Sequence, residues 1–200
     1  MSLIETITAQ LAQGKDADIA KRFGINEDVA KTAVSAAVPL IVGALARNAS
    51  KKDGADSLHK ALEKDHDGSI LDNITDLLGK KEDSDGDGIL RHALGTKRSA
   101  VEQGLSKGTG IDLASAGSLL SKLAPVVMGA LGKTQRENKL DSSGLARVLD
   151  TERKQAESGG DAGSPLGGLA GLLDRDDDGD MKDDLVDIGS DLLGGLFGKK

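Results

Sequence analysis

Two short acidic stretches carry the residue types that bind divalent cations. They are DSDGDG at 83–88 and DRDDDG at 174–179, and both fit the pattern D-x-D-x-D-G. Carboxylates at alternate positions, followed by glycine, let a tight loop wrap Ca²⁺, which prefers oxygen ligands. The candidate metal ligands are Asp83, Asp85, Asp87, Asp174, Asp176, Asp178 and Asp180. Calcium is therefore the cofactor that this pattern suggests.

Both stretches lack one ligand of the helix–loop–helix calcium motif. The complete motif carries a bidentate Glu at loop position 12. Here that position is Leu94 in the first stretch and Leu185 in the second, and neither side chain coordinates a cation. In another geometry Asp180, Asp183 or Asp184 could close the second loop, whereas the first has no following carboxylate within reach along the chain.

The competing interpretation of these stretches is structural. Asp-Gly pairs favour turns, and an Asp side chain caps a helix by accepting hydrogen bonds from free backbone N–H groups. The related stretch DHDG at 65–68 looks like such a turn and cap before ILDNITDLL. Magnesium, the other candidate cation, usually needs a phosphate-bearing partner. The sequence leaves cation binding and helix capping open.

No residue pattern indicates catalysis or nucleotide binding. His59, His66 and His92 are the only histidines, and each is expected at the surface. GALGKT at 129–134 ends like a phosphate-binding loop, but the first glycine that this loop requires is Val127. We expect Gly132 to end a helix there instead. The sequence predicts no enzyme and identifies no small-molecule substrate.

Composition excludes several classes of partner. The formal net charge is −7, and Phe23 and Phe197 are the only aromatic residues, so a nucleic-acid partner is disfavoured. The chain has no cysteine, which excludes disulfides and thiolate chemistry. The opening MSLIETITAQLAQ lacks the basic start and apolar run of a secretion signal, which favours a cytoplasmic protein. The longest apolar run, 33–46, is shorter than the roughly 20 residues of a membrane span.

Two segments that lie 86 residues apart resemble each other without a gap. GINEDVAKTAVSAAVPLIVGAL occupies 24–45, and GIDLASAGSLLSKLAPVVMGAL occupies 110–131. Their initial Gly-Ile pairs, their prolines and their final Gly-Ala-Leu triplets all align. Such self-similarity indicates a tandem duplication, in which each repeat completes its core by packing on the other.

Each repeated segment reads as a long helix. Asn26 and Asp112 are good N-cap residues. Pro39 and Pro125 should kink each helix or begin a new one, because proline lacks a backbone donor. We expect the two equivalent helices to pack closely through small side chains around a pseudo-twofold axis; the alternative is that each half packs separately. No convincing strand pattern occurs, so the predicted fold class is all-α.

The predicted domain organisation follows from the duplication. Residues 1–95 form the first helical repeat, and 96–150 form the core of the second. The polar, glycine-rich stretch 151–168 is predicted to be a flexible linker, and 80–85 a shorter one. Residues 169–200 carry the second acidic loop and an amphipathic helix that completes the second repeat.

The amphipathic segment that follows the second acidic loop has an apolar stripe at helical spacing. The stripe consists of Leu185, Ile188, Leu192 and Leu196, with Leu193 and Phe197 beside it. Nearby glycines weaken a free helix, so the segment gains stability mainly by docking. It could dock on its own core, on another subunit, or on a membrane surface with Lys199 and Lys200 near headgroups.

Several stretches of the chain resemble the YidB-like bacterial proteins, a family with a domain of unknown function. They are GINEDVAKTAVSAAVPLIVGALARNAS, DHDGSILDNITDLLG, GDGILRHALG, AVEQGLSKGTGIDL and LAPVVMGALGKTQRENKLD. The resemblance covers nearly the whole chain, and the two segments that contain GAL are its most specific parts. It implies a soluble, all-α bacterial protein. It implies no activity and carries over no functional residue.

The sequence favours a non-enzymatic structural or protein-interaction protein that self-associates or binds a protein partner through apolar helix surfaces. One alternative is divalent-cation binding, calcium above all, through the D-x-D-x-D-G loops. A weaker alternative is peripheral membrane association through the amphipathic segment, whose Asp184, Asp187 and Asp191 would be repelled by anionic lipid.

Overall fold

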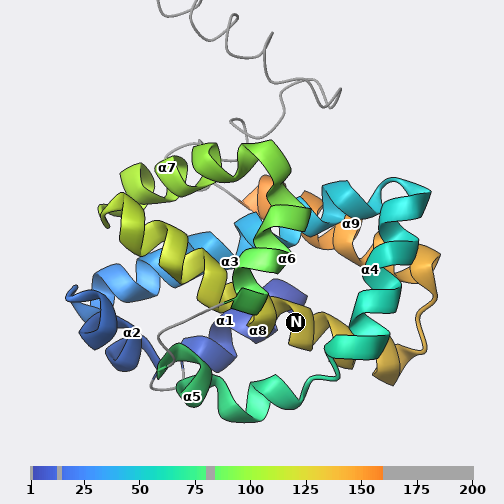
Figure 1. The fold of residues 1–200 in the computed structure, drawn as a ribbon, viewed down its shortest axis with the longest axis horizontal. Helices are drawn as coiled ribbons and strands as arrows, with labels where there is room; N and C mark the ends of the chain where they lie inside the picture. Colours follow the sequence, from blue (N-terminus) through green and yellow to red (C-terminus); the bar gives the residue numbers. More distant parts are fainter. Residues whose placement is uncertain (1, 13–14, 80–83, 160–200) are drawn as a thin grey trace, which may run out of the picture.

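The computed structural model of the protein describes residues 2–12, 15–79 and 84–159 (Figure 1). Within these residues the regular elements are all helical, which confirms the predicted all-α class. In chain order they are α1 (Leu3–Ala12), α2 (Lys15–Phe23), α3 (Glu27–Ala49), α4 (Lys52–Asp65), η1 (Ser69–Asn73), α5 (Ile74–Gly79), α6 (Ser84–Leu94), η2 (Gly95–Lys97), α7 (Arg98–Thr109), α8 (Leu113–Asn138) and α9 (Ser142–Gly159), where η marks a short 3₁₀ helix.

The two long helices, α3 and α8, contact each other at the centre of the molecule (Figure 1). Residues 119–132 of α8 are all buried, and the core around them consists of Ala, Val, Ile and Leu side chains. Small buried residues such as Ala37 and Ala124 suit close packing of helices. Because α3 contacts α8, the two halves share one core. The duplication and its pseudo-twofold axis stay predictions.

The start of each long helix is capped as the sequence predicts. The Asn26 side chain accepts a hydrogen bond from the Val29 N–H (2.8 Å), and Asp112 accepts one from the Ser115 N–H (3.0 Å). These bonds satisfy donors that a helix end otherwise leaves free. Both helices continue past their prolines, so neither Pro39 nor Pro125 begins a new helix. A kink at either proline stays a prediction.

Helix α9 extends into the stretch that the sequence assigns to a flexible linker. Residues 151–159 continue α9, which packs against α3 and α4. The buried carboxylate of Glu152 accepts hydrogen bonds from the backbone N–H groups of Leu3 (2.7 Å) and Ile4 (3.0 Å), the first residues of α1. This corrects the predicted start of the linker at 151, because a tertiary contact 149 residues away in sequence orders a polar stretch. Residues 160–168 lie outside the described part.

Two helices are long and apolar enough to cross a membrane by length and composition alone. They are α3 and α8, whose most apolar windows are 67% and 72% buried inside the fold. A mostly buried core helix of a globular protein passes the same test. In this structure their apolar side chains form the shared core described above.

Candidate functional site

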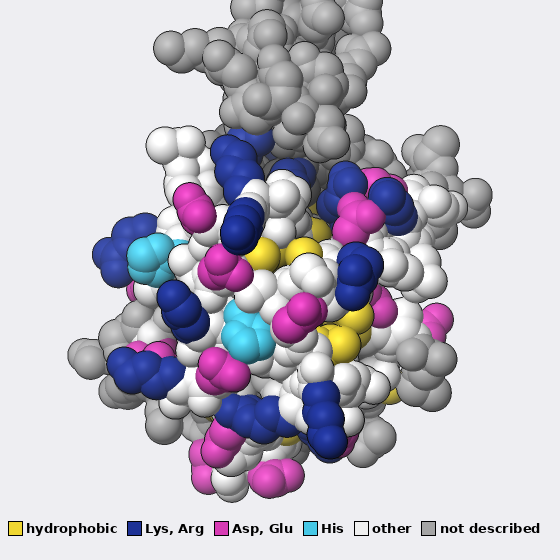
Figure 2. Space-filling view, turned by 90° about the vertical axis from the view of Figure 1, so that its right-hand side faces the viewer, with side chains coloured by type: hydrophobic (Ala, Val, Ile, Leu, Met, Phe, Trp, Pro, Cys, Tyr) yellow, Lys and Arg dark blue, Asp and Glu magenta, His cyan; other side chains and the backbone are white. Residues whose placement is uncertain are grey.

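A pocket of about 970 Å³ lies between α4 and α6, and we call it the α4–α6 groove. Both helices pack on α3 and α8, which close the groove from below. Its buried base consists of Leu45, Leu58 and Met128, from three different helices. Figure 2, turned toward the side where α4 lies, shows hydrophobic side chains at the surface among charged and histidine side chains.

The spacing of residues on α4 and α6 explains why these two helix faces line the groove. On α4 the lining residues include Leu58, Ala61 and Asp65, at positions i, i+3 and i+7. On α6 they include Asp85, Ile89 and Ala93, at successive intervals of four. Residues at these intervals share one face of a helix. The α4 wall is therefore apolar along its middle and carries a carboxylate at each end, Asp53 and Asp65, whereas the α6 wall carries Asp85 at its start.

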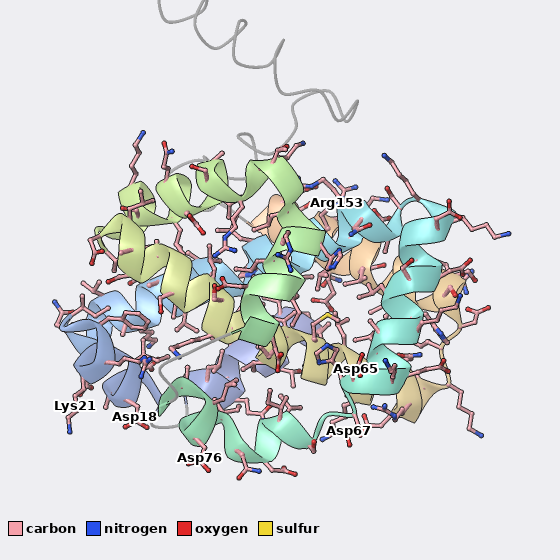
Figure 3. The ribbon with its side chains drawn as sticks, in the orientation of Figure 1. Asp18, Lys21, Asp65, Asp67, Asp76 and Arg153 are labelled. Carbon is pink, nitrogen blue, oxygen red and sulfur yellow. The ribbon has the colours of Figure 1, made fainter. Side chains whose placement is uncertain are left out.

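The polar lining of the groove is acidic. It includes the exposed Asp53, Asp65 and Asp85 and the two histidines His66 and His92, whereas no Lys or Arg is among the described residues that line it. Figure 3 shows Asp65 at the end of α4. The groove therefore favours a ligand that combines an apolar surface with positive charge.

The position of His66 is fixed by α8. His66 follows the last residue of α4, and its carbonyl oxygen accepts a hydrogen bond from Arg136 Nη1 (3.1 Å). Arg136 Nη2 also donates to the carbonyl oxygens of Leu62 and Glu63, so one guanidinium caps the end of α4. A Cβ added at Gly132 would lie 1.8 Å from the backbone oxygen of His66, so this close approach needs glycine.

The same contact corrects the interpretation of GALGKT. Gly132 was expected to end a helix, but α8 continues through it to Asn138. The glycine serves close packing against the end of α4 instead of helix termination. Sequence alone does not distinguish these uses, because both require a residue without a side chain.

Burial lowers the pKa of His66, and the negative charges of Asp65 and Asp85 partly oppose this effect. As pH falls below 6.5, the ordinary histidine value, the unfolded chain therefore binds a proton more readily than folded His66 does. We expect the free energy of unfolding to fall over this window. His66→Gln should remove that part of the pH dependence in urea unfolding. An unchanged pH slope in the variant would contradict the role given to His66.

The first acidic stretch differs from the loop that the sequence predicts. Residues 84–88 form the start of α6, and Asp85 and Asp87 lie in its first turn. Acidic side chains are favourable there because of the helix dipole. A Cβ added at Gly86 would lie 1.7 Å from the backbone oxygen of Ser121, so glycine serves packing against α8 here too. Asp83 and the proposed linker residues 80–83 lie outside the described part.

The two described candidate metal ligands have different surroundings. Asp85 lines the α4–α6 groove, whereas the Asp87 carboxylate accepts hydrogen bonds from Ser121 Oγ (2.7 Å) and Arg98 Nη2 (2.7 Å). These two partners, the serine hydroxyl first, lower the pKa of Asp87. Among the described residues no three His, Asp or Glu side chains form a metal-binding group. The other acidic stretch, with Asp174, Asp176, Asp178 and Asp180, lies outside them, and its calcium binding stays a prediction.

The third acidic stretch, at 65–68, forms the predicted turn. The Asp67 carboxylate accepts hydrogen bonds from the backbone N–H (2.9 Å) and the hydroxyl (2.5 Å) of Ser69. Both bonds, the hydroxyl's first, lower the pKa of Asp67. Gly68 has φ of 92°, a conformation that favours glycine. This turn connects the end of α4 to η1.

A smaller pocket of about 630 Å³ is lined by residues of α4, the end of α8 and the residues after it. His59 Nε2 lies 3.0 Å from the Leu140 carbonyl oxygen, and Arg136 is bonded to the end of α4. The buried Gln135 Oε1 has no hydrogen-bond partner among the described residues. Because His59 and Arg136 are already engaged in structural contacts, the α4–α6 groove is the stronger candidate site.

The family of the chain is shown by comparison with known proteins. Residues 5–134 and 136–200 match the model of a family described as bacterial protein of unknown function (DUF937). No curated protein and no solved structure matches the chain. The family match confirms the resemblance to YidB-like proteins, since YidB is a member. The chain therefore belongs to DUF937, a family of bacterial proteins whose function is unknown.

Proposed function

We propose that the protein is a non-enzymatic interaction protein whose α4–α6 groove takes one apolar helix flanked by basic residues. The observation that carries the proposal is the combination of an apolar base with an acidic lining in one pocket of about 970 Å³. Helix-in-groove recognition uses this arrangement, in which anchors at i, i+3 and i+7 enter an apolar groove.

The apolar part of the groove supplies the affinity in this proposal. Ile89, Ala61 and Ala93 are half-buried, so they retain accessible surface above the buried base. Covering apolar surface contributes roughly 25 cal/mol per Å² before the costs of association. A short helix with several apolar anchors is therefore a suitable ligand.

The acidic lining supplies the selectivity. Asp53, Asp65 and Asp85 attract a basic flank and repel an acidic one, which affects association rate and partner choice more than affinity. These residues are exposed, so salt screens their effect. We expect binding to weaken as the ionic strength rises.

A synthetic helical peptide tests the proposal directly. The probe has leucines at i, i+3, i+7 and i+11, two lysines at each end, and a fluorescent label. We expect fluorescence polarisation to give a Kd of about 10–100 µM, equivalent to roughly 5–7 kcal/mol. Asp65→Lys combined with Asp85→Lys should weaken binding at least about fivefold at low salt, because it reverses two charges at the groove.

The matched control places the same charge change elsewhere. Asp18→Lys combined with Asp76→Lys alters α2 and α5, and Figure 3 shows both residues away from Asp65. This variant should bind the peptide within about twofold of the wild-type affinity, since neither residue lines the groove. If both double variants lost the same amount of peptide affinity, the effect would come from net charge alone. That result would contradict the proposed site.

A further inference from the structure

We propose that residues 185–197 of this chain occupy the α4–α6 groove of the same molecule. The inference rests on the proposed function, because it names the occupant of the same groove. The groove is an apolar surface without an occupant among the described residues. The chain itself carries, outside those residues, a segment with an apolar stripe and a basic end.

The apolar residues of the segment match helix-in-groove recognition. Leu185, Ile188, Leu192 and Leu196 stand at i, i+3, i+7 and i+11, so a helix would present them as one stripe. Asp183 and Asp187 would fall on the opposite face, toward water, and Asp184 and Asp191 on one flank of the stripe. The apolar stripe would thus enter the groove while Asp183 and Asp187 faced water.

The charge of the segment also fits the groove at one end. Lys199 and Lys200 follow the last apolar residue, Phe197. The described lining of the groove contains Asp53, Asp65 and Asp85 and neither Lys nor Arg. A docked helix whose basic end lies beside Asp65 and Asp85, which both lie near His66, gains favourable charge pairing. The opposite orientation would bring the basic end toward Asp53 alone, so the two carboxylates Asp65 and Asp85 favour the first direction.

The length of the intervening chain permits docking within one molecule. Helix α9 ends at Gly159, so 25 residues separate it from Leu185. A flexible chain of that length spans about 25–30 Å on average, whereas a fold of about 150 residues has a radius of gyration of about 15 Å. The groove is thus within reach of the tethered segment.

Tethering makes even weak docking effective. A linker of this kind gives an effective concentration of about 1 mM, so a segment with an intrinsic Kd of about 100 µM would occupy the groove about nine-tenths of the time. An external partner would then have to displace the segment, so its apparent affinity would be about tenfold lower than for a chain whose segment cannot dock. The segment therefore acts as an internal competitor for the groove.

Thiol accessibility in the full chain tests this inference. The chain has no cysteine, so Ala61→Cys places a single reporter thiol in the groove. Its reaction with Ellman's reagent is compared with and without Leu192→Asp plus Leu196→Asp. Loss of docking should raise the rate about tenfold, because the groove is then always open. Ser99→Cys, at an exposed position on α7, is the control whose rate should not change.

Each outcome decides the inference. A rate increase that is the same at low and high chain concentration supports docking in the same molecule. An increase that depends on chain concentration assigns the segment to the groove of a second copy and overturns the inference. No rate increase also overturns it. Binding of the fluorescent leucine–lysine peptide, measured on the same variants, separates this inference from the proposed function. If the peptide binds but the segment does not dock, the proposed function stands. If neither occupies the groove, the proposed function fails too.

Discussion

Gly86→Ala is expected to lower the free energy of unfolding by about 3 kcal/mol, although it adds only one methyl group. The added Cβ would lie 1.7 Å from the backbone oxygen of Ser121 and 2.7 Å from its carbonyl carbon. Because these are backbone atoms of α8, α6 has to move as a whole. Urea unfolding followed by circular dichroism measures the loss.

Gly88→Ala is the matched control two residues further along α6. A Cβ at Gly88 meets nothing within 4 Å, and alanine favours helix over glycine. This variant should therefore be more stable than the wild type by about 0.5–1 kcal/mol. Equal effects of the two substitutions would contradict the close approach of α6 to α8.

Glu152→Ala is expected to lower the free energy of unfolding by about 2–3 kcal/mol. The Glu152 carboxylate, only 7% exposed as a residue, caps α1 by accepting two hydrogen bonds from its first backbone N–H groups. Charged hydrogen bonds contribute roughly 1.5–3 kcal/mol, and their removal leaves both donors without this acceptor. Hydrogen exchange of the Leu3 and Ile4 amides, alongside chemical unfolding, measures the local and global effects.

Glu157→Ala on the same helix provides the comparison. Glu157 is exposed and pairs with Arg153 (3.1 Å) four residues earlier. Such a surface pair contributes about 0.3–0.5 kcal/mol. If Glu152→Ala lowered the free energy of unfolding no more than Glu157→Ala does, the contact between α9 and α1 would contribute little to stability.

Local sequence signals predicted the helix starts but not the long-range contacts. Asn26 and Asp112 could be identified because an N-cap depends on a side chain and the backbone three residues later. The role of Glu152 could not, because its partners are at Leu3 and Ile4, and nothing local distinguishes it from a linker glutamate. Gly132 looked like a helix end because its contact, with the backbone of His66, is also distant in sequence.

The candidate site also depends on contacts between residues that are distant in sequence. The pattern around Asp85 and Asp87 predicts a shared cation-binding loop, whereas both residues lie in the first turn of α6. In the helix that they form, one carboxylate lines the groove and the other is bonded to Arg98 and Ser121. The apolar base of the groove had no local signal, since Leu45, Leu58 and Met128 come from three separate helices. Only the packing of those helices brings them together.

The methyl group of Met128 provides the most direct test of the proposed groove. Met128 is buried at the base of the groove, and the chain has only two other methionines, so selective methionine labelling gives few resonances. During titration with the leucine–lysine peptide, its methyl resonance is expected to shift and saturate at the Kd obtained by polarisation. Asp65→Lys plus Asp85→Lys should move this midpoint to higher peptide concentration. Saturable peptide binding that leaves the Met128 methyl resonance unchanged would contradict the account, because the helix would then bind elsewhere.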